Sequence, residues 1–290
     1  MFFKDNVISS IKKNESDPTK IKNFFSKEKC EELIKFRNTI SKRLVDREES
    51  TKVPFFFEDH DLTKNLKADI EKEVGEFSVK DFEPHFITTR FPLRLHADTG
   101  KDPNDIIFKN IVIPLEINYE NNSIENKKFS HTIIFKNKWY DKSSIFTTKT
   151  NNNYDFIIKD LTGKFVDIVD IFEFKAKIDE VDNDKVVFKN NEFYVDKKFK
   201  DYIDSLSKTK RYNQRTDKHI IIKKEFDRHI YDKYMTHQPY EDCSGLELDK
   251  AIGWEPGALI YWDRVRIHSS DNFLKNGIKS KTCIALFTSK

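Results

Sequence analysis

Apolar residues recur at spacings of three and four in two stretches near the start of the chain. In the first, Ser26 is a suitable N-cap for a stripe made of Cys30, Leu33, Phe36, Ile40 and Leu44. In the second, from about Leu62 to Val74, apolar side chains fall four apart and Gly75 provides a C-cap. The spacing predicts one helix in each stretch, after a short lead-in over residues 1–25.

Short β-prone runs replace the helical pattern after Gly75. They read FEPHFITTRF, LRLHAD, IIFKNIVIPLEINY and HTIIF, with the turn-forming stretch GKDPND at 100–105 between two of them. The C-terminal part repeats this style, with GALIYWDRVRIHSS and KTCIALFTS joined by DNFLKNG. The pattern predicts a mainly β architecture with flanking helices, in the α+β class.

The middle of the chain, residues 140–235, follows neither pattern. It is rich in Lys, Asn and Asp, with short apolar bursts such as FIIKDL and KVVFKNNEFYV and no clear repeat. We interpret it as an insertion between two halves of one β scaffold, and as a candidate substrate lid. The prediction is a single domain over 1–290: helical support at 1–80, a β core at 81–139 and 236–290, and the insertion at 140–235.

Charge and cysteine content narrow the class of protein. The chain has 52 basic and 49 acidic side chains, mixed along its length, which argues against a nucleic-acid partner despite the run SLSKTKRYNQR at 205–215. Its three cysteines are far apart and odd in number, so no disulfide framework is expected and a reducing cytoplasm fits best. The N-terminus has neither a signal peptide nor a membrane span.

The segment LRLHADTG carries the clearest chemical signal. Residues two apart on a strand face the same side, so His96 and Asp98 can bind one metal ion from one strand. A second imidazole would complete a two-His-one-carboxylate triad, which holds iron(II) and leaves positions open. His268, in the strand-like run ALIYWDRVRIH, is the candidate. The HxD motif alone is weak, because a histidine on a strand is more often a core or surface residue.

Taken together, three segments resemble the superfamily of iron(II)- and 2-oxoglutarate-dependent oxygenases. LRLHADTG, GWEPGALIYWDRVRIHSSDNF and GIKSKTCIALFT occur in the order of that superfamily, and are most similar to its prolyl-hydroxylase-like and phytanoyl-CoA-hydroxylase-like branches. The resemblance covers about residues 85–135 and 235–290. It implies a double-stranded β-helix, a jelly-roll and cupin-like fold, in which His96, Asp98 and His268 are catalytic metal ligands.

The same resemblance implies the reaction. The protein would be a dioxygenase that uses Fe(II), O2 and 2-oxoglutarate as cosubstrate, and hydroxylates an unactivated C–H bond of a small molecule or a peptidyl residue. Succinate and CO2 would be released. Related halogenases have a small residue in place of the carboxylate, so Asp98 favours hydroxylation or a related oxidation.

A cation is expected to bind the distal carboxylate of 2-oxoglutarate, because such a buried anion needs a charge-assisted hydrogen bond. The family places this basic residue after the distal histidine. Lys279 and Lys281 have the same strand parity, so alternation leaves both open. We favour Lys281 because the apolar strand TCIALF starts directly after it, and hold Lys279 in reserve.

Five further residues are candidates for the site. Thr88 and Asn110 could hydrogen-bond 2-oxoglutarate, whereas Arg90, Arg94 and Arg266 are candidate substrate-binding residues. Arg94 and Arg266 share strand parity with the histidines that follow them. For each of these five residues, a purely structural contact explains its presence at least as well as a functional role. Arg266, for example, could pair with a buried acid.

Two other functions remain open at this stage. A non-catalytic or cosubstrate-independent cupin-like protein could use the same scaffold. Cupin sites commonly contain an HxH pair, which the chain lacks. A nucleic-acid demethylase of the same superfamily would need a basic face, and the balanced charge argues against it.

Overall fold

The computed structural model describes residues 2–40, 45–46, 50–79, 84–120, 129–146, 156–162, 165–168, 171–181, 185–188, 190–208 and 224–290. The chain forms two compact units, residues 1–148 with 216–290, and residues 149–215. The second unit is shorter than the insertion predicted at 140–235, since residues on both sides of it belong to the first unit.

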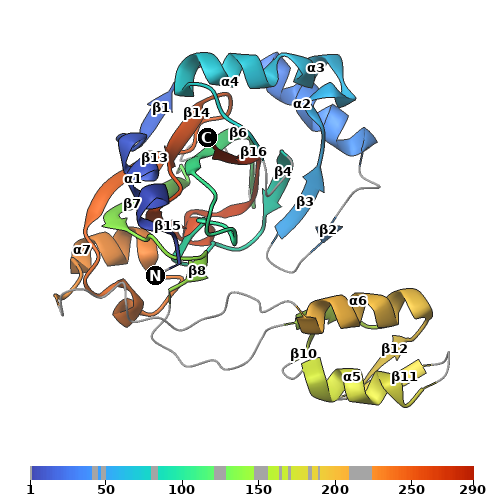
Figure 1. Ribbon diagram of the computed structural model, residues 1–290. Coiled ribbons are helices and arrows are strands. Elements are labelled where there is room, and N and C mark those ends of the chain that lie inside the picture. The colour runs from blue at the N-terminus through green and yellow to red at the C-terminus, as the bar shows by residue number, and fades with distance from the viewer. Residues whose placement is uncertain are drawn as a thin grey trace. The chain divides into compact units, whose positions relative to one another are not determined.

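Two antiparallel sheets make up the larger unit (Figure 1). Within the described ranges, a seven-stranded sheet has the order β1-β14-β6-β16-β4-β3-β2 and a five-stranded sheet the order β13-β7-β15-β5-β8. The strands are β1 Thr19–Ile21, β2 Val45–Asp46, β3 Ser50–Pro54, β4 His85–Thr89, β5 His96–Ala97, β6 Ile107–Tyr119, β7 His131–Lys138, β8 Ser144–Ile145, β13 Leu248–Gly253, β14 Leu259–Asp263, β15 Arg266–Ser270 and β16 Ile278–Ser289.

Eight of these strands are divided between the sheets in the manner of a double-stranded β-helix, alternating along the chain except that β7 and β13 lie in the same sheet. The strands β4, β6, β14 and β16 lie in the larger sheet, and β5, β7, β13 and β15 in the smaller. Each sheet therefore combines strands from both ends of the sequence, as in a jelly roll. The predicted fold class is confirmed.

Hydrophobic clusters show which face of each sheet lies inside. Ile87, Ile134, Ile252 and Cys283 belong to a cluster contributed by both sheets, which fills the barrel interior. A second cluster packs the opposite face of the larger sheet against the N-terminal helices, and a third covers the opposite face of the smaller sheet. Side chains alternate between faces along a strand, so a residue's parity tells whether it can reach the interior.

The helices α2, α3 and α4 lie over the outer face of the larger sheet (Figure 1). The helix α2 (Lys27–Thr39) begins as predicted at Ser26, whose side chain accepts a hydrogen bond from the Lys29 amide. It ends one turn early, and Leu44 falls outside the described residues. The second predicted helix is two helices, α3 (Asp61–Lys64) and α4 (Leu66–Val74), separated at Asn65.

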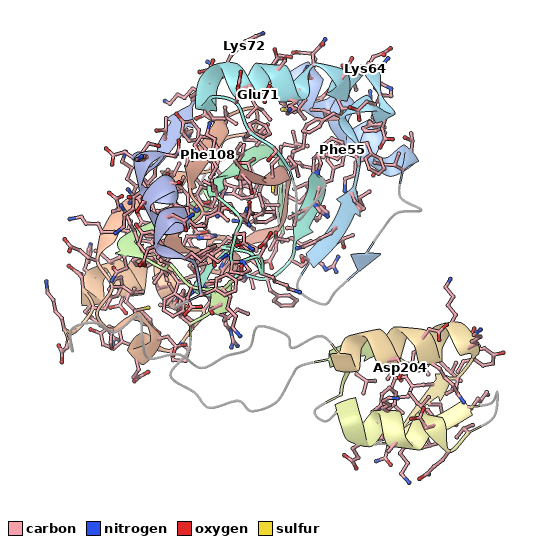
Figure 2. All side chains as sticks on the ribbon, in the orientation of Figure 1. Phe55, Lys64, Glu71, Lys72, Phe108 and Asp204 are labelled. Carbon is pink, nitrogen blue, oxygen red and sulfur yellow. The ribbon has the colours of Figure 1, made fainter. Side chains whose placement is uncertain are left out.

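Figure 2 shows how these helices divide polar from apolar side chains. Lys64 and Lys72 point away from the sheet and pair with acidic residues three positions earlier, at 2.5 Å and 2.9 Å. Phe55 is fully buried in the cluster between helices and sheet. The helices thus cover the outer face of the larger sheet and do not enter the barrel interior.

The first 25 residues are more ordered than the predicted lead-in. Val7 and Ile11 of the helix α1 (Asp5–Lys13), and Phe3 just before it, pack against Ile107 and Val265 of the barrel. Strand β1 then pairs with β14 at the edge of the larger sheet. The region expected to give helical support therefore also supplies strands β1, β2 and β3.

The C-terminal run GALIYWDRVRIHSS, which the sequence pattern treats as one strand-like segment, forms two strands. It contains β14 and β15, which lie in different sheets and are joined by Arg264 and Val265. Apolar periodicity continues through the junction because both strands are buried, so the pattern alone does not show the change of sheet.

Gly257 lies in the segment 254–258, which leads into β14. Its φ is 85°, and a Cβ there would lie 2.4 Å from the carbonyl oxygen of Phe25. The Phe25 amide also donates to the Gly257 carbonyl at 2.8 Å, so the backbones cannot separate without losing this bond.

We expect Gly257→Ala to lower the free energy of unfolding by roughly 2–4 kcal/mol, through backbone strain and this clash. Gly277→Ala is the matched control. Its φ is 72°, but no heavy atom lies within 4 Å of the added Cβ, so the loss should be only about 1 kcal/mol. Urea denaturation of both variants measures the difference, and equal losses would contradict this account.

The smaller unit consists of two hairpins, each followed by a helix. The described elements are β9 Phe156–Lys159, β10 Phe165–Ile168, α5 Ile171–Asp179, β11 Lys185–Phe188, β12 Asn191–Tyr194 and α6 Lys197–Lys208. Phe174 and Phe193 lie at the centre of its own hydrophobic core. Lys175 on α5 pairs at 2.6 Å with Asp204 on α6, which Figure 2 labels.

Candidate metal centre

The structure brings together the three residues predicted as metal ligands. His96 lies on β5 and His268 on β15, and the two are direct partners in the strand pairing. Asp98 follows β5 by one residue, beyond the short strand. Its Oδ2 lies 3.1 Å from His268 Nε2 and 3.6 Å from His96 Nε2, and one ligand atom from each residue falls within 4.8 Å of the others.

The backbone orients both imidazole rings. His96 Nδ1 lies 2.6 Å from the carbonyl oxygen of Arg94, and His268 Nδ1 lies 2.9 Å from that of Arg266. A carbonyl only accepts, so each Nδ1 must carry the ring proton. Each ring therefore directs Nε2, the nitrogen that would bind a metal, toward Asp98. This arrangement, in which a second partner fixes the tautomer of a ligating histidine, is typical of metal sites.

The charges of the cluster are balanced around Asp98. Burial alone would raise the pKa of Asp98, but His96, His268 and Arg264 together hold it well below its usual range. Burial and the neighbouring His268 lower the pKa of His96 to about 4. At neutral pH the cluster therefore contains a carboxylate and a neutral His96, the protonation states that metal binding requires.

Two residues from elsewhere in the barrel hold Asp98. Asn110 on β6 donates from Nδ2 to Asp98 Oδ2 at 3.2 Å, and Arg264 donates from Nε to the Asp98 carbonyl at 2.7 Å. Arg264 is buried and also donates to the Thr288 carbonyl at 3.1 Å. It therefore ties the loop after β5 to the end of β16.

The donor set fits a divalent transition metal. Two imidazole nitrogens and one carboxylate oxygen form the facial triad of non-haem iron sites. Asp98 is ionised and His96 neutral at neutral pH, and hydrogen bonds to the backbone orient both histidine rings.

Lys281 and Lys279 differ sharply in environment. Lys281 is 1% exposed, and its Nζ lies 3.9 Å from the centre of the Trp254 ring, inside the barrel. Lys279 is exposed at a bulge, where the pairing of β16 with β6 shifts between Ile278 and Ser280. The bulge breaks the alternation that made the two lysines equivalent in the sequence. Only Lys281 faces the interior.

A hydrogen-bonded chain extends from Lys281 to His131. Lys281 Nζ donates to Ser130 Oγ at 2.9 Å, and Ser130 Oγ donates to Asp271 Oδ1 at 2.8 Å. Asp271 Oδ2 lies 3.2 Å from His131 Nδ1. Burial lowers the pKa of Lys281 to about 8, and Asp271 partly opposes this shift. The ammonium therefore lies beside one hydroxyl and aromatic rings, with N–H groups available for an anion.

The two residues predicted to contact 2-oxoglutarate, Thr88 and Asn110, lie on different faces of the larger sheet. Thr88 hydrogen-bonds Thr282 at 2.9 Å and has the parity of Phe86, so it lies on the helix-covered face of the sheet. Its neighbour Thr89 is the strand partner of Lys281. Asn110 does reach the interior, but its observed contact is with Asp98.

The three predicted substrate-binding arginines are not gathered at the metal centre. Arg266 is buried and pairs with Asp263 at 3.5 Å and with Asp249, at a point where the pairing of β15 with β7 shifts register. This is the structural pairing that the sequence left open. Arg90 donates to Thr51 at 2.7 Å, whereas the Arg94 side chain is exposed.

Four residues of the site were not predicted. Arg264 donates to Asp98, Ser130 and Trp254 contact Lys281, and Asp271 accepts a hydrogen bond from Ser130. Arg264 and Asp271 lie close in sequence to His268, and this closeness is the only sequence feature that could have pointed to them. Nothing in the sequence pattern pointed to Ser130.

No protein-family model and no curated protein matches the chain. Solved structures similar to it include the epimerase SnoN in complex with Fe3+, alpha-ketoglutarate and nogalamycin RO (7% identity, 97% of this chain and 83% of that one, TM-score 0.41). Another is the non-haem alpha-ketoglutarate-dependent carbocyclase SnoK from nogalamycin biosynthesis (8% identity, 99% of this chain and 84% of that one, TM-score 0.43). A third is EctD from S. alaskensis in its apoform (9% identity, 99% of this chain and 77% of that one, TM-score 0.39).

These similarities are too weak to transfer an activity to this chain, whose fold is defined by its own strand topology. Among the helices that the structure describes, none is long and apolar enough to cross a membrane.

Proposed function

We propose that this protein is an iron(II)- and 2-oxoglutarate-dependent oxygenase. The observation that carries the proposal is the convergence of His96, Asp98 and His268 at one point of a double-stranded β-helix. The buried Lys281 adds to it, because a cation inside an apolar barrel calls for an anionic ligand.

Each residue has a defined task in this proposal. His96, Asp98 and His268 would hold the iron, and Lys281 would bind the distal carboxylate of 2-oxoglutarate. When bound, iron and 2-oxoglutarate would supply the oxidising power that inserts an oxygen atom from O2 into a C–H bond, with release of succinate and CO2. The apolar side chains of the interior would exclude water from the reacting groups.

We further propose hydroxylation of a small molecule or a peptidyl residue as the reaction. Asp98 supports this choice over halogenation, because its carboxylate fills the position that a halide would need. The smaller unit, residues 149–215, remains a candidate for substrate recognition.

Anaerobic titration with Fe(II) and 2-oxoglutarate tests the proposal. We expect the weak visible charge-transfer band of iron chelated by a 2-oxo acid, and succinate on admission of O2. Absence of the band in a folded, iron-loaded protein would refute the cosubstrate. Oxygen uptake that ignores 2-oxoglutarate would instead favour a cupin-type enzyme, and iron binding without any turnover of 2-oxoglutarate a non-catalytic relative.

A further inference from the structure

Two buried polar atoms beside the metal centre have no hydrogen-bond partner in the described part of the chain. They are Oδ1 of Asn110 and Nε1 of Trp262. Asn110 is 2% exposed and Trp262 is 3% exposed, so bulk water does not reach them. A buried polar group without a hydrogen-bond partner is unfavourable. In native proteins almost all such groups bind another protein group, a water molecule or a ligand.

The two side chains are neighbours on the inner face of the barrel. Asn110 on β6 is the direct strand partner of Trp262 on β14, which places their Cβ atoms roughly 5 Å apart. Asn110 has the parity of Val112, and both Val112 and Trp262 belong to the interior cluster. The two unpartnered atoms therefore share one region of the interior.

Both residues also touch the metal ligands. Asn110 Nδ2 donates to Asp98 Oδ2 at 3.2 Å, and the Trp262 ring lies edge-on to the His268 ring with 5.0 Å between centres. The region that the two unpartnered atoms share thus adjoins the triad. A molecule held there would lie next to a metal-bound reactant.

The hydrogen-bonding roles of the two atoms are fixed. An amide flip would turn the Asn110 oxygen toward the carboxylate of Asp98, so Nδ2 must face Asp98 and Oδ1 must remain the free acceptor. The indole N–H only donates. The missing partner must therefore accept from Trp262 and donate to Asn110, which a single O–H group can do and a carboxylate cannot.

We propose that Asn110 and Trp262 form a binding site for one hydroxyl oxygen beside the triad. The occupant is either a water molecule or an alcohol group of the organic substrate, which share this chemistry. If the iron proposal also holds, the site favours substrates that carry a hydroxyl near the carbon to be oxidised. The site itself rests on these two side chains and does not depend on iron.

Indole N–H spectra of the ¹⁵N-labelled, metal-free protein test the proposal. The three tryptophans are assigned by replacing each with phenylalanine, and the Asn110 side-chain amide is a second reporter. Trp254 and Trp139 are matched controls, since their N–H groups already donate to Thr132 Oγ1 at 2.8 Å and to the Lys142 carbonyl at 2.9 Å. The probes are water and added ethanol.

We expect a cross-peak from the Trp262 N–H to a long-lived water, or to the ethanol methylene protons with a saturable shift. The first outcome identifies water and the second an alcohol site, and the controls should not respond. Asn110→Ala should weaken the ethanol response roughly 3- to 10-fold, the loss of one neutral hydrogen bond. In Trp262→Phe, the Asn110 amide should cease to respond.

Two results would overturn the proposal. One is a Trp262 N–H with no cross-peak to water or ethanol. The other is a response that stays unchanged in Asn110→Ala. Because Trp262→Phe keeps an aromatic ring in the core, it provides a reading even if Asn110→Ala fails to fold.

Discussion

Asp98→Ala is expected to abolish tight metal binding and, with it, the charge-transfer band and all turnover. The carboxylate is the only anionic member of the cluster, and its Oδ2 lies within 3.6 Å of both Nε2 atoms. Losing a residue that merely supports a ligand costs 10- to 100-fold in metal affinity, so losing the ligand itself should cost more than about 100-fold. Titration with Zn(II) against a chelator measures this directly.

Asp102→Ala is the control for that variant. Asp102 lies in the same loop, and its carboxylate accepts from the Asn104 amide at 2.9 Å on the surface. Metal affinity should not change. If Asp98→Ala bound Zn(II) as tightly as the native protein while remaining folded, the triad would not be the metal site.

Lys281→Met is expected to remove most of the affinity for 2-oxoglutarate while leaving metal binding intact. Methionine matches the lysine stem in shape and can pack against Trp254. A hydrogen bond to a charged group contributes about 1.5–3 kcal/mol, which corresponds to a loss of roughly 10- to 150-fold. The metal-free protein should not be less stable, because replacing a buried charge by an apolar group is often neutral or stabilising.

Lys279→Met is the matched control, because this lysine is exposed at the bulge two residues earlier. Affinity for 2-oxoglutarate, measured by calorimetry, should be unchanged. The reverse result, in which Lys279→Met loses affinity and Lys281→Met does not, would assign the cosubstrate to the other lysine.

The pH dependence follows from the same lysine. Burial lowers the pKa of Lys281 to about 8, so the cation proposed to bind 2-oxoglutarate is lost above that pH. Affinity should fall about tenfold per pH unit above 8 in the native protein, and stay flat in Lys281→Met. In the absence of ligand, the free energy of unfolding changes with pH in the opposite direction to the affinity. In the unfolded chain this lysine keeps its proton up to its ordinary pKa of 10.5, so it makes stability rise with pH between about 8 and 10.5.

The sequence revealed the parts of the fold that local periodicity determines. Ser26 and the stripe after it defined the start of α2, and the HxD spacing singled out His96 and Asp98. His268 required a resemblance across distant segments, because no local rule links residues so far apart in the chain.

The remaining features depend on strand pairing, which a single sequence does not display. The bulge at Lys279 decides which lysine is buried, and Arg266 pairs with Asp263 and Asp249 instead of reaching the metal centre. Ser130 reaches Lys281 only because two sheets face each other. Parity arguments hold between bulges and fail across them.

The short ladder between β5 and β15 has a consequence for how this protein can change over evolution. His96 and His268 stand opposite each other on adjoining strands, so one inserted or deleted residue in either strand would swing an imidazole to the far side of the sheet. By contrast, residues 149–215 form a compact unit of their own and can vary in length without shifting that ladder. Tolerance to insertions should therefore differ sharply between two segments only some fifty residues apart in the chain.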